Sequence, residues 1–285
     1  MPALLYQITP ADPHAHLFEV ILTISSPASE GQTLSLPAWI PGSYMIREFA
    51  KNIVTIEASC EGKRVKLSKR DKQTWMAAKC HGPLMIRYQI YAWDLSVRTA
   101  HLDANHGFFN GSSVFLRAHG LEEVPHRVHI KPAVGLEHWK VATALPRVNE
   151  KNIKTKLWSF GFYEAPNYDA LIDHPVEMGS FVHAHFEACG APHEIVVTGK
   201  VPKLDLARLQ SDFSRICTAQ IQLFEPKTSL APFLDSSDRY VFMTQAWGDG
   251  HYGGLEHRAS TALVCSRNDL PIVGQETPSD AYRDF

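Results

Sequence analysis

About the first 165 residues hold no helix-period segment longer than about two turns, and this absence restricts the fold more than any other feature of the sequence. Their apolar residues gather instead in short runs rich in β-branched and aromatic side chains, such as residues 16–24, 85–93 and 127–131. Turn-forming pairs separate these runs at Pro41-Gly42, Glu61-Gly62 and Asn110-Gly111. Such spacing is typical of sandwiches. We therefore predict a mainly β N-terminal domain, antiparallel and sandwich-like.

A change in residue pattern predicts a domain junction between residues 160 and 173. The sequence from residue 160 reads FGFYEAPNYDALIDHP, with two prolines and several turn formers. A chain of 285 residues is also long enough to bury two cores of ordinary size. We assign residues 1–172 to the β-domain and residues 173–285 to a second domain.

The second domain has a different periodicity. Apolar residues recur at spacings of mostly three and four over residues 204–224, which predicts an amphipathic helix that ends before Pro226. Strand-like runs come before this segment, at residues 193–199, and after it, near residues 240–247 and 260–265. The alternation of strand, helix and strand predicts an α/β domain.

Composition and charge exclude several partners. The formal net charge of −2 and the pI near 6.7 give no general attraction to nucleic acid or to acidic membranes. No apolar run is long enough to span a bilayer. The five cysteines are odd in number and never in C-x-x-C spacing, which favours a reducing compartment. We therefore expect a cytoplasmic protein with no nucleic-acid partner and no membrane partner.

A glycine pattern near the C-terminus invites a nucleotide-binding interpretation. Gly248-x-Gly250-x-x-Gly253 follows a predicted strand, as in dinucleotide-binding turns. However, a strand-like segment rather than a helix follows Gly253, and too few residues remain to complete a doubly wound sheet. We therefore do not expect a nucleotide site.

Fifteen histidines make a metal site worth testing. His-x-His pairs occur at His14/His16 and His183/His185, and each pair would lie on one face of a strand. Neither pair has a third ligand at a recognisable spacing. We predict no metal site in this chain.

Two further groups of residues leave their roles open. The turn at Pro41-Gly42 lies among Trp39, Tyr44 and Arg47, whose side chains could either reach into a cleft or cap the β-domain. The segment Gly253-Gly-Leu-Glu-His could form a strand edge that pairs with an extended peptide, with its carboxylate on the peptide's α-amine. It could equally be a surface β-bulge with ordinary exposed charges.

Three segments in the same order resemble the glycyl-aminopeptidase family of zinc metallopeptidases. They read WIPGSYMIREFAKNI, NYDALIDHPVEMGSF and WGDGHYGGLEHRAS, and the resemblance extends from about Tyr6 to Phe285. Proteins of this family usually have an N-terminal β-domain, a thermolysin-like catalytic domain and a C-terminal PDZ domain. The resemblance implies that residues 173–285 are the α/β opening portion of a thermolysin-like domain.

The same resemblance implies roles for individual residues. The substrate-aligning edge strand would comprise Gly253, Gly254, Leu255, Glu256 and His257, with Glu256 binding the free amino terminus of a peptide substrate. His257 replaces the asparagine found in related aminopeptidases.

The resemblance also makes the loop carrying Trp39, Tyr44 and Arg47 a candidate to reach the cleft. It implies no catalytic residue within this chain.

The sequence departs from the family in one respect. The family's zinc helix, H-E-x-x-H, is absent: His193-Glu194 begins like it, but Val197 stands where the second histidine belongs. We therefore expect zinc to be the cofactor of a full-length aminopeptidase that removes N-terminal residues such as Gly or Ala. We expect no metal and no activity in this chain, which would end before the zinc helix.

Two further expectations follow. A chain that lacks the rest of its catalytic domain would expose apolar surface and could self-associate through it. The alternative from another functional class is a non-enzymatic β-sandwich module for binding or scaffolding.

Overall fold

The computed structural model describes residues 2–285, which form two compact units. Unit 1 runs to Val141 and continues over Leu145–Gly179, whereas unit 2 comprises Ala142–Ala144 and Ser180–Phe285. The units separate after Gly179 because strand β17 (Val176–Gly179) pairs with a strand of unit 1. The domain boundary after residue 172 stays a prediction.

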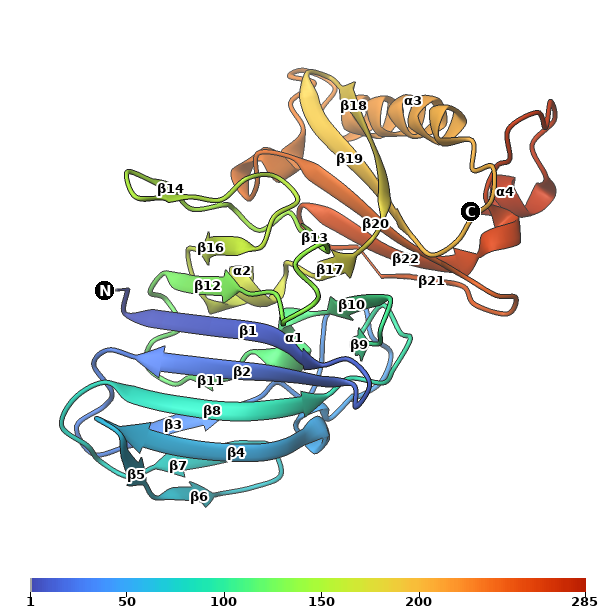
Figure 1. The fold of residues 1–285 in the computed structure, drawn as a ribbon. Helices are drawn as coiled ribbons and strands as arrows, with labels where there is room; N and C mark the ends of the chain where they lie inside the picture. Colours follow the sequence, from blue (N-terminus) through green and yellow to red (C-terminus); the bar gives the residue numbers. More distant parts are fainter. Residues whose placement is uncertain (1) are drawn as a thin grey trace. The chain divides into compact units, whose positions relative to one another are not determined.

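The largest sheet of unit 1 has seven strands (Figure 1). Neighbouring strands are antiparallel except for β1 and β12, which run parallel. Buried and partly exposed residues alternate along β2 and β8, because successive side chains of a strand point to opposite faces. In spatial order the strands are β16 (Gly161–Ala165), β12 (His126–Ile130), β1 (Leu4–Asp12), β2 (Leu17–Ile24), β8 (Leu84–Tyr91), β4 (Ile53–Cys60) and β5 (Lys63–Val65).

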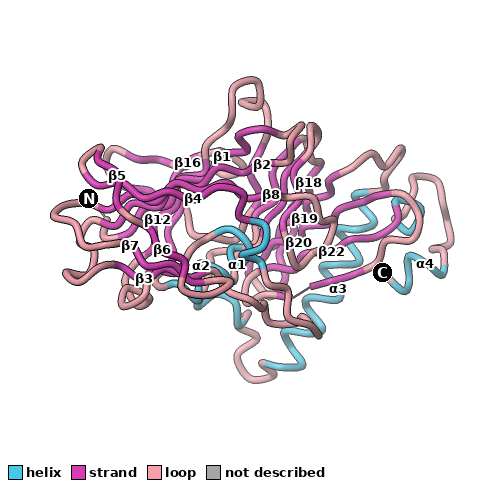
Figure 2. Tube along the Cα trace, turned by 90° about the horizontal axis from the view of Figure 1, so that it is seen from below, coloured by secondary structure: helices cyan, strands magenta, loops and turns pink. Residues whose placement is uncertain are grey.

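Smaller sheets complete unit 1. One contains β11 (Arg117–Ala118), β3 (Gln32–Ser35), β7 (Thr74–Ala77) and β6 (Leu67–Lys69), and Figures 1 and 2 both show it against one face of the seven-stranded sheet. A second four-stranded sheet contains β13 (Lys140–Ala142), β17, β10 (His106–Phe109) and β9 (Ala100–Leu102). A two-stranded sheet pairs β14 (Asn149–Glu150) with β15 (Ile153–Lys154). Its helical segments are short: η1 (Phe49–Asn52), α1 (Gly111–Val114) and α2 (Tyr168–Ile172). The predicted mainly β, sandwich-like domain is confirmed.

Three buried tyrosines fix the chain that follows α1 to its surroundings. The hydroxyls of Tyr88, Tyr168 and Tyr6 donate hydrogen bonds to the carbonyl oxygens of residues 114, 115 and 116, respectively. The donor–acceptor distance is 2.7 Å in each of the three bonds. Tyr88 also accepts a hydrogen bond from the backbone N–H of Leu116. Burial raises the pKa of all three phenols, so they remain donors throughout the physiological range.

Asn110-Gly111 separates two strands, as predicted: β10 ends at Phe109 and the one-turn helix α1 begins at Gly111. One local expectation about unit 1 is wrong. His14 and His16 do not lie on a strand face but in the turn between β1 and β2, where Asp12 accepts from the backbone N–H of His14. His16 there adopts a left-handed φ of 60°.

Unit 2 is a five-stranded mixed sheet with one long helix. The outer pairs β18–β19 and β22–β21 are antiparallel, whereas β19, β20 and β22 run parallel. Across the sheet the strands are β18 (Val182–Ala188), β19 (Ala191–Thr198), β20 (Tyr240–Trp247), β22 (Ser260–Ser266) and β21 (Gly253–Glu256). The remaining segments are α3 (Leu206–Phe224), η2 (Pro232–Asp235), η3 (Arg267–Asp269) and α4 (Asp280–Asp284). The predicted α/β architecture is confirmed.

Helix α3 makes the crossover between the parallel strands β19 and β20. Its N-cap Asp205 accepts a hydrogen bond from the backbone N–H of Arg208, and the helix ends two residues before Pro226, which cannot continue it. The helix lies along β18 in Figure 1, and Gln210 donates to the carbonyl of His185 over 2.6 Å. The predicted amphipathic helix is confirmed.

Within residues 2–285, no helix combines the length and the apolar character needed to cross a membrane.

The tyrosine contacts predict a stability difference between two positions of β8. Tyr88→Phe leaves the Val114 carbonyl and the Leu116 N–H without their buried partner, so the free energy of unfolding should fall by about 1–3 kcal/mol. The matched control is Tyr91→Phe on the same strand, because Tyr91 is 43% exposed and should change little. Urea denaturation measures both, and equal losses would contradict the assigned role of Tyr88.

Candidate functional site

Strand β21 forms one edge of the sheet in unit 2. It pairs with β22 from Gly253 opposite Val264 to Glu256 opposite Thr261, and no other described strand adjoins it. Leu255 is buried and Glu256 is exposed, as alternation along a strand requires. The predicted strand therefore exists, and it is the last strand at its end of the sheet.

The turn after β21 fixes the position of Glu256. The N–H of His257 donates to the carbonyl of Ser260 over 2.8 Å, which closes a hairpin into β22. Arg258 in this turn forms an ion pair with Asp235, and its Nη2 donates to the carbonyl of Pro232 over 3.2 Å. The hairpin is thereby attached to η2.

The glycine-rich segment before β21 is also held in place. Asp249 accepts hydrogen bonds from the Ser266 hydroxyl and from the Asn268 side-chain amide, each over 2.9 Å. A strand rather than a helix begins at Gly253, as expected from the sequence, so the segment lacks the helix that a dinucleotide site requires. The hydrogen bonds of Asp249 could not be predicted from the sequence, because its partners lie 17 and 19 residues further along the chain.

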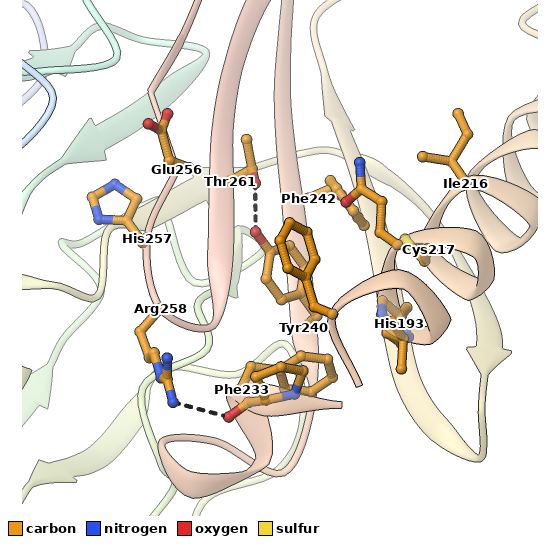
Figure 3. A pocket seen from close by; sticks show the side chains of 14 residues that line it. His193, Ile216, Cys217, Phe233, Tyr240, Phe242, Glu256, His257, Arg258 and Thr261 are labelled. Atoms are coloured by element: carbon orange, nitrogen blue, oxygen red, sulfur yellow. Dashed lines mark hydrogen bonds between the residues drawn. The ribbon is translucent and has the colours of Figure 1, made fainter. Parts of the chain in front are cut away.

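A pocket of about 460 Å³ opens beside the turn, between α3, η2 and the sheet (Figure 3). Aromatic rings form much of its wall: the ring centroids of Phe233 and Tyr240 lie 5.3 Å apart, and those of Tyr240 and Phe242 lie 4.9 Å apart. The Tyr240 hydroxyl lies 2.6 Å from the Thr261 hydroxyl, which holds that ring against the sheet. Glu256 lies at the margin, and Figure 3 shows its carboxylate turned away from the aromatic rings.

The other polar groups of the pocket do not favour covalent chemistry. Burial lowers the pKa of His193, so its imidazole is neutral at pH 7 despite its hydrogen bond to the Ala191 carbonyl. Burial raises the pKa of the Cys217 thiol to about 11, so this thiol is not a nucleophile at neutral pH. The pocket therefore offers an apolar surface with a carboxylate at its margin.

The other candidates from the sequence belong to unit 1. Ser43 organises their loop: its carbonyl accepts from the Trp39 indole N–H over 2.8 Å, and its hydroxyl accepts from Arg47 Nε over 2.9 Å. Tyr44 is fully exposed. The structure thus gathers Trp39, Tyr44 and Arg47 in one compact loop, whereas Gly253–Glu256 and His257 lie in unit 2.

Unit 2 does not contain the ligand set of a metal centre. His183 and His185 both lie on β18, and His185 Nδ1 lies 3.2 Å from Glu194 Oε1. Among residues 2–285, three metal-ligating side chains come together only at His101, Asp103 and His106, in unit 1.

Comparison with known proteins identifies the N-terminal part of the chain. The model of the Peptidase M61 N-terminal domain matches residues 5–180. An aminopeptidase N family protein from Idiomarina loihiensis superposes with a TM-score of 0.91 and 42% identity, over 99% of this chain and 45% of that protein.

More distant solved structures share the fold. An M1 zinc metallopeptidase from Deinococcus radiodurans superposes with a TM-score of 0.52 and 12% identity, over 92% of this chain and 59% of that one. A variant of the Deinococcus enzyme bound to a Tyr-Ser-Ala substrate gives a TM-score of 0.51 and 12% identity. That superposition covers 96% of this chain and 60% of the variant.

The chain therefore spans less than two thirds of the length of these solved relatives. A search of curated proteins found no match. Because the M61 domain matches more than half of the sequence, the chain belongs to the peptidase M61 family.

Proposed function

We propose that this chain is the N-terminal part of a zinc-dependent aminopeptidase, in which β21 aligns a peptide and Glu256 binds its α-amine. The observation that carries the proposal is the position of an exposed carboxylate at the end of an edge strand. Membership of a peptidase family supports it, as do the zinc metallopeptidase neighbours, one of which was solved with the tripeptide Tyr-Ser-Ala.

Edge pairing explains how such a site would hold a substrate. An extended peptide can add to an exposed sheet edge through main-chain hydrogen bonds, which are independent of its side chains. The two glycines at the start of β21 carry no side chains that would keep the peptide backbone away. The strand would therefore fix the direction and depth of the peptide and leave its first residue near Glu256.

Glu256 suits the recognition of an amino terminus. Among residues 2–285 no hydrogen bond or ion pair engages its carboxylate, so the charge is available for a ligand. A carboxylate and an ammonium group form a charge-assisted hydrogen bond, roughly twice as strong as a neutral one. A peptide with a blocked amine would lose this interaction, so the arrangement selects free N-termini.

The chemistry of bond cleavage belongs to the longer protein. Residues 180–285 bring no three metal ligands together, so they do not fit a catalytic zinc ion. A thermolysin-like remainder that carries the zinc ligands, a C-terminal PDZ domain and a preference for N-terminal Gly or Ala are parts of the same proposal. The chain of 285 residues should bind peptide ends weakly and hydrolyse none.

The role of Glu256 can be tested in the complete gene product. Glu256→Gln keeps the shape of the side chain but removes its charge, so kcat/KM for a peptide with a free amine should fall by roughly 10- to 100-fold. N-acetylated peptides should be poor substrates for both proteins. The control is Glu187→Gln, an exposed carboxylate on the opposite edge strand β18, which should behave as wild type.

Two results would count against this role. An unchanged kcat/KM with unchanged preference for free amines would remove Glu256 from amine binding. A complete gene product without peptidase activity would favour the non-enzymatic binding module.

We also propose that the apolar surface around the pocket is covered by further chain in the longer protein. Leu223 and Phe224 at the end of α3 are 72% and 74% exposed, and Ile216 on the same helix is half exposed. Contiguous exposed apolar groups of this kind mark an interaction surface. In the isolated chain of 285 residues, a second copy would take the place of the missing chain.

This surface predicts concentration-dependent self-association of the 285-residue chain. Light scattering coupled to gel filtration should show a rising mass with concentration, and Phe224→Asp should shift the protein toward the monomer. Val134→Asp is the control, because Val134 is 99% exposed but lies in unit 1. A wild-type chain that stays monomeric at all concentrations and binds no hydrophobic dye would contradict the proposal.

A further inference from the structure

The β9–β10 hairpin of unit 1 brings together three side chains that commonly bind metals. His101 lies on β9, His106 begins β10, and Asp103 lies in the connection between the strands. One ligating atom from each of the three lies within 4.8 Å of the others. Antiparallel pairing holds this geometry, because the N–H of Asp103 donates to the carbonyl of His106 over 2.9 Å.

Asp103 is oriented by the backbone of its own turn. Its Oδ1 accepts hydrogen bonds from the N–H groups of Asn105 and His106, with N···O distances of 2.6 and 3.0 Å. Its Oδ2 lies 3.5 Å from His101 Nε2. Neighbouring ligands of a tetrahedral zinc ion lie about 3.3 Å apart, so these two atoms already have nearly the required separation.

His106 is oriented by a buried carboxylate from another strand. Its Nδ1 lies 2.9 Å from Glu177 Oε1, and both side chains are only 1% exposed. With Nδ1 bound to Glu177, coordination would use Nε2. A histidine whose second nitrogen contacts a carboxylate is the usual arrangement in metal sites, because the carboxylate fixes the ring and makes it a stronger ligand.

Ring stacking fixes the planes of both imidazoles. The ring centroids of His101 and His106 lie 5.0 Å apart with an interplanar angle of 28°, and His101 also packs against Trp93 at 4.8 Å. His101 is buried, whereas the Asp103 side chain remains 19% exposed. An ion could therefore enter from the side of Asp103 and meet histidines that are already ordered.

We propose that His101, Asp103 and His106 bind one divalent transition-metal ion of the zinc type within the β-domain. Two imidazoles and one carboxylate suit zinc and cobalt, whereas calcium and magnesium prefer all-oxygen sites. Water would complete the coordination. Because Glu177 lies on β17, the bound ion would tie the β9–β10 hairpin more firmly to that neighbouring strand. The proposal concerns unit 1 and is independent of the aminopeptidase function.

Metal titration of the 285-residue chain tests the site directly. The protein is stripped with EDTA and titrated with Co²⁺, followed by visible absorption, and with Zn²⁺, followed by calorimetry. We expect one equivalent of Co²⁺ to bind, Zn²⁺ to displace it, and the Tm to rise with Zn²⁺ but not with Mg²⁺. A wild-type chain that binds neither Co²⁺ nor Zn²⁺ overturns the proposal.

Two variants assign the ion to these residues. Asp103→Asn retains the oxygen that accepts hydrogen bonds from the N–H groups of the turn but loses the negative charge. His101→Phe retains a stacked ring but loses the ligating nitrogen. Each variant should weaken Zn²⁺ binding by at least roughly tenfold. Their controls are Asp71→Asn, which also accepts from a backbone N–H, and His129→Phe, which stacks on Phe162 in the same unit. Both controls should bind as wild type.

Binding that survives both variants, or that is lost instead in His183→Gln, overturns the proposal. If the two variants fail to fold, X-ray absorption of the zinc-loaded wild-type chain decides. A ligand shell of two imidazoles and oxygen supports the site, and any other number of imidazoles contradicts it.

Discussion

The pairing of β21 with β22, on one side only, is the interaction on which the proposed peptide site depends. It buries Leu255, exposes Glu256 and leaves the outer edge of β21 at the margin of the sheet. Neither end of the strand is free to move independently: Asp249 fixes the segment before it, and Arg258 fixes the turn after it. Glu256 therefore sits on a supported strand rather than on a flexible loop, as precise binding of a small charged group requires.

Unit 1 follows the same physical logic with other groups. Several of its buried polar side chains meet a partner on a different element, as in the tyrosine hydroxyls bonded to residues 114–116 and the contact of His106 with Glu177. Such contacts are costly to leave incomplete in a low-dielectric interior, so they specify one arrangement of the strands. The fixed geometry of the β9–β10 hairpin is the physical basis of the proposed metal site.

Local patterns were readable from the sequence, and long-range pairings were not. The helix over residues 206–224 was predictable because its apolar period and the following proline are local signals. The residues alone left a strand at Gly253–Glu256 open against a surface β-bulge, since a four-residue strand with two glycines carries little periodicity, and the resemblance favoured the strand. The cluster around His106 was missed because its spacing matches no familiar ligand motif and its partner Glu177 lies 71 residues away. The prediction that His16 lies on a strand face was wrong because its neighbours in the sequence are strand-like and give no local signal of a left-handed turn residue.

The peptide site can be tested with a crystal structure of the complete gene product bound to a slowly hydrolysed peptide. The peptide should lie as an added strand along the outer edge of β21, with its α-amine within hydrogen-bond distance of the Glu256 carboxylate. A peptide bound elsewhere, or an edge of β21 already occupied by another segment of the same protein, would contradict it.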